Sequence, residues 1–309
     1  MGKAPPPPNS DIHAVRPVPV RHPARWIGGA ALLLFVFLFV RLLVTNENLQ
    51  WEVVAAYLLS PEILAGLGRT LLLTFLAMIF GLAIGVVLAI MRLSSNPVFQ
   101  SASWLWIWFF RGVPPLVQLV FWYNLALLIP TVSFGIPFGP QFWTGSTNLL
   151  ITPFSAAILG LALTESAYAS EMIRAGIQAI SVGQTEAAAT LGMTRGQILR
   201  RIILPQALRI LIPPIGNDTI SMLKFTSLVS VLALPDLLYS AQMIYSRTYQ
   251  TIPLLIVATI WYLVLSTVLT LAEHYIEHRL HDRPLRLGIA LSSIFKSKFW
   301  APQRLEVRS

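Results

Sequence analysis

The 309-residue chain contains no cysteine, which excludes a disulfide framework, a thiolate zinc site, an iron–sulfur cluster and a cysteine nucleophile. Charge is the second shortage: Asp, Glu, Lys and Arg make up 11% of the residues, against about 25% in a soluble domain. With 55% hydrophobic residues, the chain has too few polar groups to cover the surface of a soluble globule. The composition therefore predicts a membrane protein.

Long apolar runs are what the sequence has instead. A helix that crosses the hydrocarbon core needs about 20 apolar residues. Leu71–Met91 and Ile252–Ala272 meet this length without a charge, and Ile27–Val44 is interrupted only by Arg41. Three further runs have polar interruptions: Trp104–Pro130, Pro153–Ile173 and Ile210–Leu234. We therefore expect an all-α, polytopic membrane helical bundle with about six transmembrane helices.

The basic residues predict the direction in which the chain crosses the membrane, because Lys and Arg gather in cytoplasmic loops. One set of inner segments contains 18 of the 22 basic residues: 1–26, 92–111, 174–209 and 279–309. The outer segments are 45–69, 131–151 and 235–251, and they contain only Arg69 and Arg247. Both termini are therefore expected in the cytoplasm. The net charge of +9 then reflects topology and contact with membrane lipid, and no nucleic-acid partner is expected.

The inner segment between the fourth and fifth spans is far longer than a simple connector of about 2–8 residues. Thr185–Leu191 is rich in helix formers, and Gly192 follows where a left-handed residue can end a helix. A second short helix is expected over Arg195–Ile203, ending at Pro205 because proline cannot continue a helix. The pattern predicts a compact projection of two helices on the cytoplasmic face.

This segment also carries a motif with specific spacing. Glu186-Ala187-Ala188 is followed by Gly192, then by Ile202 and Leu204-Pro205. The motif resembles the signature of permease subunits of binding-protein-dependent ATP-binding-cassette importers. Further stretches over about 66–280 resemble the polar amino-acid permeases of that family, the histidine, glutamine, glutamate and arginine type: Arg69–Thr74, Arg111–Gln118, Ala167–Arg174, Gly183-Gln184, Leu204–Ala207 and Lys224–Leu228.

The resemblance implies a multi-pass protein of the bacterial cytoplasmic (inner) membrane. Its importer transmembrane domain would be 66–280, with a coupling loop at 174–206. Residues 27–44 would then be an additional N-terminal transmembrane helix. The sequence composition predicts a disordered cytoplasmic tail before it (1–26) and a basic cytoplasmic tail after the importer domain (281–309). The implied partners are a cytoplasmic ATPase dimer, a second permease chain that is identical or different, an extracytoplasmic amino-acid-binding protein and the amino-acid substrate.

The resemblance also implies that the coupling loop docks into the ATPase and passes its closure motion to the spans. The residues implied in this role are Gly183, Gln184, Glu186, Ala187, Ala188, Gly192, Leu204 and Pro205. A purely structural alternative for Glu186 is to balance the helix dipole.

The chain has no phosphate-binding loop of its own. Such a loop ends in Gly-Lys-Ser or Gly-Lys-Thr, and none of the four lysines follows one: Lys3, Lys224, Lys296 and Lys298. We therefore expect a transport subunit and not an enzyme, with no bound cofactor. ATP and magnesium would bind to the partner ATPase.

Charged residues inside the predicted spans are the second group of candidates. A charge at the bilayer centre costs about 2.5–3.5 kcal/mol, so Glu165, Glu171, Asp218 and Lys224 are expected to avoid lipid. Carboxylates there could meet the ammonium group of an amino acid, and Lys224 its carboxylate. The alternative is internal ion pairing, such as Glu171 with Arg174. The predicted substrate path consists of Thr164, Glu165, Tyr168, Glu171, Lys224, Thr226 and Ser227.

Glycine and proline mark two further features of the spans. Gly81 and Gly85 permit close helix packing in the second span. The run Gly112-Val113-Pro114-Pro115 is expected to break the third span. The resemblance makes Arg111, Gly112 and Pro114 candidates for gating.

Two other functions stay open from the sequence. The chain could be the partner permease of a heterodimeric importer that binds no substrate itself. It could also be a membrane metallohydrolase, since His274, Glu277 and His278 fit the His-x-x-Glu-His zinc pattern. Their position just after the last span favours a solvated helix end, and no metal site is expected.

Overall fold

The structure, a computed structural model, describes residues 23–136 and 139–281. The chain divides into two compact units, residues 1–50 and 51–309, and each is described by itself. Most of the two predicted tails, 1–22 and 282–309, lies outside the described residues, so the expectations for the tails stay predictions.

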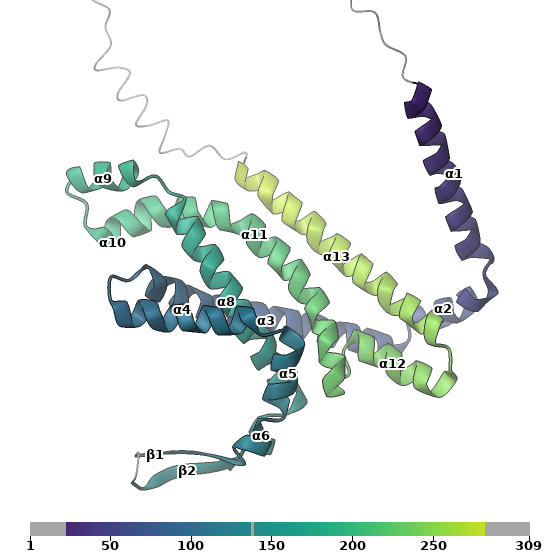
Figure 1. Ribbon diagram of the computed structural model, residues 1–309, viewed down its shortest axis with the longest axis horizontal. Helices are drawn as coiled ribbons and strands as arrows, with labels where there is room; N and C mark the ends of the chain where they lie inside the picture. Colours follow the sequence, from purple (N-terminus) through teal and green to yellow (C-terminus); the bar gives the residue numbers. More distant parts are fainter. Residues whose placement is uncertain (1–22, 137–138, 282–309) are drawn as a thin grey trace, which may run out of the picture. The chain divides into compact units, whose positions relative to one another are not determined.

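Helices form nearly all of the described part of each unit (Figure 1). The first unit contains α1 (Pro23–Thr45) and a 3-10 helix, η1 (Glu47–Leu49). The second contains α2 (Trp51–Leu58), α3 (Pro61–Leu93), α4 (Pro97–Gly112), α5 (Pro115–Tyr123), α6 (Leu125–Leu128), β1 (Thr131–Gly135), β2 (Gln141–Ser146), α7 (Thr147–Leu150), α8 (Pro153–Gln178), α9 (Val182–Thr190), α10 (Arg195–Ile198), the π-helical η2 (Leu199–Ile203), α11 (Leu204–Phe225), the 3-10 helix η3 (Thr226–Leu232), α12 (Leu237–Thr248) and α13 (Thr251–His281).

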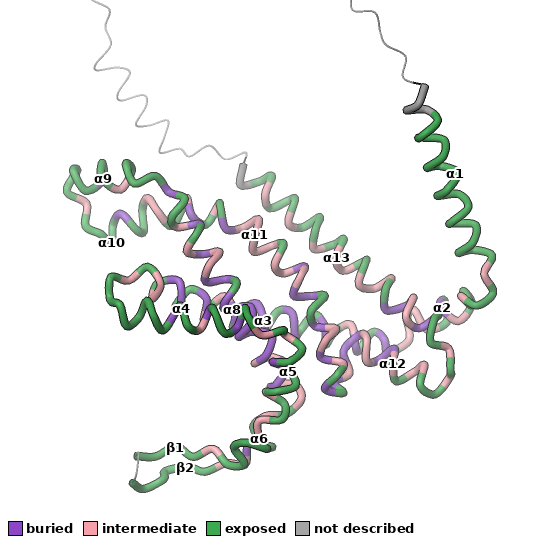
Figure 2. Tube along the Cα trace, viewed as in Figure 1, coloured by how far each residue is buried: buried purple, intermediate pink, exposed green. Residues whose placement is uncertain are grey.

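Helix α1 contains the predicted N-terminal span 27–44. Every residue from 27 to 44 is exposed, although the run is almost entirely apolar (Figure 2). A helix that is apolar on all sides matches a membrane-spanning segment.

The centre of the second unit is the contact between α3 and α8, and both helices carry many buried residues (Figure 2). Gly85 of α3 faces Ala169 of α8 so closely that an added Cβ would lie 2.7 Å from the Ala169 Cβ. Gly81 faces Glu165 in the same way. The two glycines therefore let the backbones approach, as their spacing predicts. Around this contact the core is formed by α5, α11 and η3 through Leu119, Met222 and Val229.

In the described part of the chain, the predicted spans correspond to long apolar helices, to bent pairs of helices, or to one less apolar helix. The spans 27–44, 71–91 and 252–272 lie in α1, α3 and α13, which are each long and apolar enough to cross a membrane. The third and fifth spans are bent pairs: α4 and α5 meet at 100°, and the helix that ends at Leu232 meets α12 at 44°. The fourth span is α8, which is less apolar and is covered by α3, α4, α5 and α11. The count of six is therefore approximate, while the all-α bundle is confirmed.

The turn predicted at Gly192 is confirmed. Gly192 has φ +77°, and α9 ends just before it. Its N–H donates to the carbonyl of Ala189 at 2.9 Å, and the N–H of Met193 donates to that of Ala188 at 3.1 Å. These two bonds form a Schellman motif, which satisfies the last carbonyls of the helix.

The predicted helix end at Pro205 is wrong. The chain from Arg195 to Leu232 is one continuous helical run, and Pro205 lies inside it. The π-helical turn η2 ends at Ile203, two residues before Pro205, and the N–H of Leu204 donates to the carbonyl of Leu199, five residues back. The wider turn accommodates a residue that has no N–H to donate and whose ring would clash in a regular helix.

A short antiparallel hairpin interrupts the otherwise helical chain between α6 and α7. Strands β1 and β2 pair with Phe134 opposite Trp143, and the register shifts after Phe134. The hairpin extends away from the helices of its unit (Figure 1). No sequence pattern noted above predicts this hairpin.

Candidate functional site

Glu165 is enclosed where α3, α8 and α11 meet. The residue is 3% exposed, and an added Cβ at Gly81 would overlap its Cγ. The carboxyl groups of Glu165 and Asp218 interact across α8 and α11. Glu165 Oε1 is buried and has no hydrogen-bond partner within the described residues. A proton or a cationic group would stabilise such a pair, since two carboxylates that share a site repel each other.

Thr164 lies beside this acid but faces the helix break. Its hydroxyl donates to the carbonyl of Gly160 at 2.8 Å and to Gln118 Oε1 at 3.0 Å. Gln118 Nε2 in turn donates to the carbonyls of Phe110 and Val113, at 3.0 and 2.9 Å. One buried amide therefore fastens the end of α4 and the start of α5 to α8.

The break itself lies at the predicted place. Helix α4 ends at Gly112, and α5 begins with Pro115 after the 100° bend. The Arg111 guanidinium lies 5.1 Å from the ring centroid of Tyr168, which is a cation–π contact between α4 and α8. The gating candidate Arg111 and the path candidate Tyr168 thus form a pair, away from the enclosed Glu165.

Glu171 forms ion pairs. Its carboxylate accepts from Arg174 at 2.6 Å and lies 4.0 Å from Arg92 of α3. Arg174 also donates to Gln178. All three charged side chains are half-exposed. The internal pairing that was the alternative for Glu171 is therefore present in the structure.

The three path candidates of α11 and η3 lie in different surroundings. Lys224 is exposed, and Ser227 donates to the Lys224 carbonyl at 2.7 Å. Thr226 is fully buried and donates to the carbonyl of Leu223 at 2.6 Å. The structure does not bring these residues together with Glu165 in one cluster; Asp218 is the residue of α11 that reaches it.

The coupling candidates form an exposed surface on α9 and its turn. Glu186, Ala187, Gly192, Gly183 and Gln184 are exposed, whereas Ala188 is buried. Gln184 accepts a hydrogen bond from Gln206 at 2.7 Å, which ties the start of α9 to α11.

Further along, Leu204 and Pro205 are exposed at the start of α11. Leu191, which the sequence analysis did not single out, is 81% exposed beside Gly192. Leu191 therefore adds exposed apolar surface to the turn that follows α9.

The stretch Arg69-Thr70 has a structural role at the other end of α3. Arg69 Nη1 donates to the carbonyl of Pro235 at 2.9 Å, and Thr70 Oγ1 accepts from the N–H of Leu237 at 3.1 Å. Asp236 between them is fully buried and accepts from Tyr239 N–H at 2.9 Å, which caps α12.

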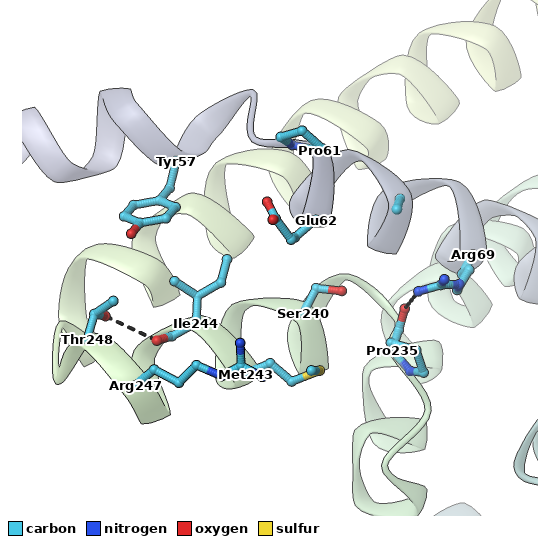
Figure 3. A pocket seen from close by; sticks show the side chains of 11 residues that line it. Tyr57, Pro61, Glu62, Arg69, Pro235, Ser240, Met243, Ile244, Arg247 and Thr248 are labelled. Carbon is cyan, nitrogen blue, oxygen red and sulfur yellow. Dashed lines mark hydrogen bonds between the residues drawn. The ribbon is translucent and has the colours of Figure 1, made fainter.

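A cavity of about 660 Å³ opens beside this turn, between the α2–α3 region and α12 (Figure 3). Its lining carries charges of both signs, from Glu62, Arg69 and Arg247. None of the predicted site residues lines it.

The zinc pattern gains no support from the described residues, which contain no group of three or more His, Cys, Asp or Glu placed to hold a metal. His274 and His278 contact each other edge to face, with ring centroids 5.5 Å apart.

Comparison with known proteins places the chain among transport proteins. Residues 81–282 match the family described as binding-protein-dependent transport system inner membrane component. An arginine transport system permease protein of Corynebacterium glutamicum is 42% identical over 260 residues, which cover 84% of this chain and 81% of that protein. A nopaline transport system permease protein of Agrobacterium fabrum is 35% identical over 228 residues, covering 72% and 91%.

A solved structure points the same way. The crystal structure of an amino acid ABC transporter with histidines has 37% sequence identity and a TM-score of 0.60, and the match covers 71% of this chain and 94% of that chain. The family match includes both Glu165 and the α9–Gly192 turn. The metallohydrolase alternative is not favoured. The chain belongs to the binding-protein-dependent transport system inner membrane components, and it is the permease subunit of an ATP-binding-cassette amino-acid importer.

Proposed function

We propose that this permease carries an amino acid with a cationic side chain past the Glu165–Asp218 pair. The observation that carries the proposal is the buried Glu165 Oε1, which lacks a hydrogen-bond partner among the described residues. A guanidinium or ammonium group offers the donors and the positive charge that this carboxyl pair lacks. The arginine transport permease at 42% identity supports the same substrate class.

Measuring uptake tests this proposal in the complete importer, reconstituted in vesicles. In Glu165→Gln the charge is removed at constant size, so arginine uptake should fall at least tenfold, about 1.4 kcal/mol, while the ATPase stays bound. Glu273→Gln is the matched control, because Glu273 also rests on a glycine of a neighbouring helix, Gly216 of α11. Equal arginine uptake per folded molecule in both variants would remove Glu165 from the path.

The chain works, in this proposal, with partners that supply the energy and the substrate. A cytoplasmic ATPase dimer binds ATP and magnesium, and the permease itself binds no nucleotide. A second permease chain, identical or different, completes the path, and an extracytoplasmic binding protein delivers the amino acid. Both termini lie in the cytoplasm, as the distribution of 18 basic residues favours. Labels at residues 10 and 300 should therefore be reached only from the inside.

The exposed surface of α9 and Gly192 docks the ATPase, in this proposal, with Glu186 and Leu191 as its contacts. A matched pair of leucines tests the docking, because Leu191 and Leu149 are 81% and 80% exposed and lie in segments predicted on opposite sides of the membrane. Leu191→Asp should release the ATPase during purification, while Leu149→Asp should retain it. Retention of the ATPase by both variants would contradict the docking role.

A further inference from the structure

The hairpin between α6 and α7 has one aromatic face. Phe134 and Trp143 pair across the strands, with ring centroids 5.9 Å apart. The Trp143 ring lies over Gly145, where an added Cβ would overlap the ring. Side chains alternate between the two faces of a strand, so Val132, two residues before Phe134, lies on this same side. Val132, Phe134 and Trp143 are called the aromatic face below.

The opposite side of the hairpin carries hydroxyl groups. The alternation places four residues there, and the register pairs them with each other: Thr131 with Ser146 and Ser133 with Thr144. Phe142, at the end where the register shifts, is the apolar exception on this side. The hairpin is therefore amphipathic, although its polar side has no charge.

The absence of charge extends well beyond the hairpin. Residues 112–164 contain no Asp, Glu, Lys, Arg or His. The apolar surface also continues past the strands, because Leu127, Leu128 and Leu149 are exposed at the base of the hairpin. The base is closed by Thr147, whose N–H donates to the carbonyl of Pro130 at 3.0 Å and whose hydroxyl bonds the carbonyl of Ile129.

We propose that the aromatic face of this hairpin lies in the membrane interface, at the level of the lipid headgroups. Tryptophan and other aromatic side chains favour this level, and an uncharged segment loses no ionic hydration there. The hairpin stays out of the hydrocarbon core, because each of its two strands has an outer edge whose backbone groups would lose their hydrogen bonds in lipid. An uncharged surface lacks the electrostatic complementarity that steers a protein partner to its site. Insertion of aromatic side chains into the bilayer interface does not require such complementarity.

The inference depends only on the chain being a membrane permease. It does not depend on the substrate path or on the docking of the ATPase.

Depth measurements with spin labels test the inference in the complete importer. The chain has no cysteine, so Val132→Cys and Ser133→Cys each give one labelling site per copy of this chain, in an importer whose other subunits have had any reactive cysteine replaced. These neighbouring positions lie on the aromatic and the hydroxyl side of β1. For each label we compare the collision rate with oxygen, which enters the bilayer, and with a nickel complex, which stays in water. We expect the ratio of the oxygen rate to the nickel rate to be several-fold higher for the label at 132 than for the label at 133. The contrast should be the same in phosphatidylcholine vesicles with and without phosphatidylglycerol, because the hairpin is uncharged.

A second variant shows whether the aromatic pair causes the contrast. This variant combines Phe134→Ser and Trp143→Ser with Val132→Cys. In it, the label at 132 should become as accessible to the water-soluble nickel complex as the label at 133. Equal water accessibility at both positions in the parent hairpin would overturn the inference. Protection that arises only when the extracytoplasmic binding protein is added would also overturn it, in favour of protein docking. Arginine uptake measured on the same vesicles reports separately on the proposed function.

Discussion

The coupling segment and the Glu165 site place their functional groups in opposite surroundings. In the coupling segment, hydrogen bonds between neighbours fix the backbone at Gly192, while Glu186 and Leu191 reach solvent. At the other site, Glu165 is enclosed by Gly81 of α3 and Asp218 of α11, which are distant in sequence. A docking surface can thus be formed by one contiguous motif. The surroundings of an acid inside the membrane, in contrast, are set by residues of two other helices.

The largest effect is expected where the enclosure of Glu165 is filled. Gly81→Leu would place side-chain atoms on Glu165 Cγ and near the carbonyl of Ala162. Overpacking typically costs about 1–3 kcal/mol, and a leucine that overlaps a neighbouring helix should lie at the upper end of that range. We expect little folded protein in detergent, measured by size-exclusion chromatography and thermal unfolding. Gly68→Leu is the matched control, because nothing lies within 4 Å of an added Cβ there. The same unfolding temperature in both variants would contradict the close α3–α8 contact.

A smaller loss is expected at the helix break. Gln118→Ala removes the amide that serves Phe110, Val113 and Thr164. Leaving buried polar groups unpaired costs about 1–3 kcal/mol, so the unfolding temperature should fall and uptake should fall with it. Asn124→Ala is the control. It removes an exposed amide that donates to the Val120 carbonyl, so the unfolding temperature and uptake should change little. An unchanged Gln118→Ala variant would show that the bend does not depend on this amide.

The contrast between local and long-range specification explains what the sequence predicts and what it does not. The spans in α3 and α13 and the turn at Gly192 follow from runs and residues that act within one segment. The helix end predicted at Pro205 is wrong because a π-helical turn accommodates the proline within the helix. No short sequence pattern predicts such a turn.

Contacts between segments are the other part that the sequence analysis missed. Helical spacing puts Glu165, Tyr168 and Glu171 near one face, yet each meets a different neighbour: Asp218, Arg111 and Arg92. The hairpin was missed because its residues lie in the outer segment between the predicted third and fourth spans, for which no secondary structure was predicted. In each case the structure is decided by contacts with residues outside the short stretch of sequence from which the prediction was made.

The coupling segment should respond more mildly to a backbone change. Gly192 has φ +77°, so Gly192→Ala strains the turn by about 1–2 kcal/mol. Gly196→Ala is the matched control, because Gly196 is equally open but lies in α10. We expect weaker co-purification of the ATPase with Gly192→Ala alone, while both variants keep the unfolding temperature of the bundle. Equal ATPase recovery from both would show that the turn geometry is not needed for docking.

The smallest effect is expected at the half-exposed ion pairs. Arg92→Gln removes the 4.0 Å contact with Glu171, which keeps Arg174. Exposed pairs contribute about 0–1 kcal/mol, so stability should change little and the change should shrink further at high salt. A large loss of uptake at unchanged stability would assign Glu171 and Arg92 to the path after all.

The separation of the two sites is tested most directly by measuring arginine uptake and ATPase retention together in Glu165→Gln and Leu191→Asp importers. The account predicts that Glu165→Gln retains the ATPase and loses uptake, whereas Leu191→Asp loses the ATPase and, with it, uptake. Loss of the ATPase in Glu165→Gln, or full uptake in that variant, would contradict it.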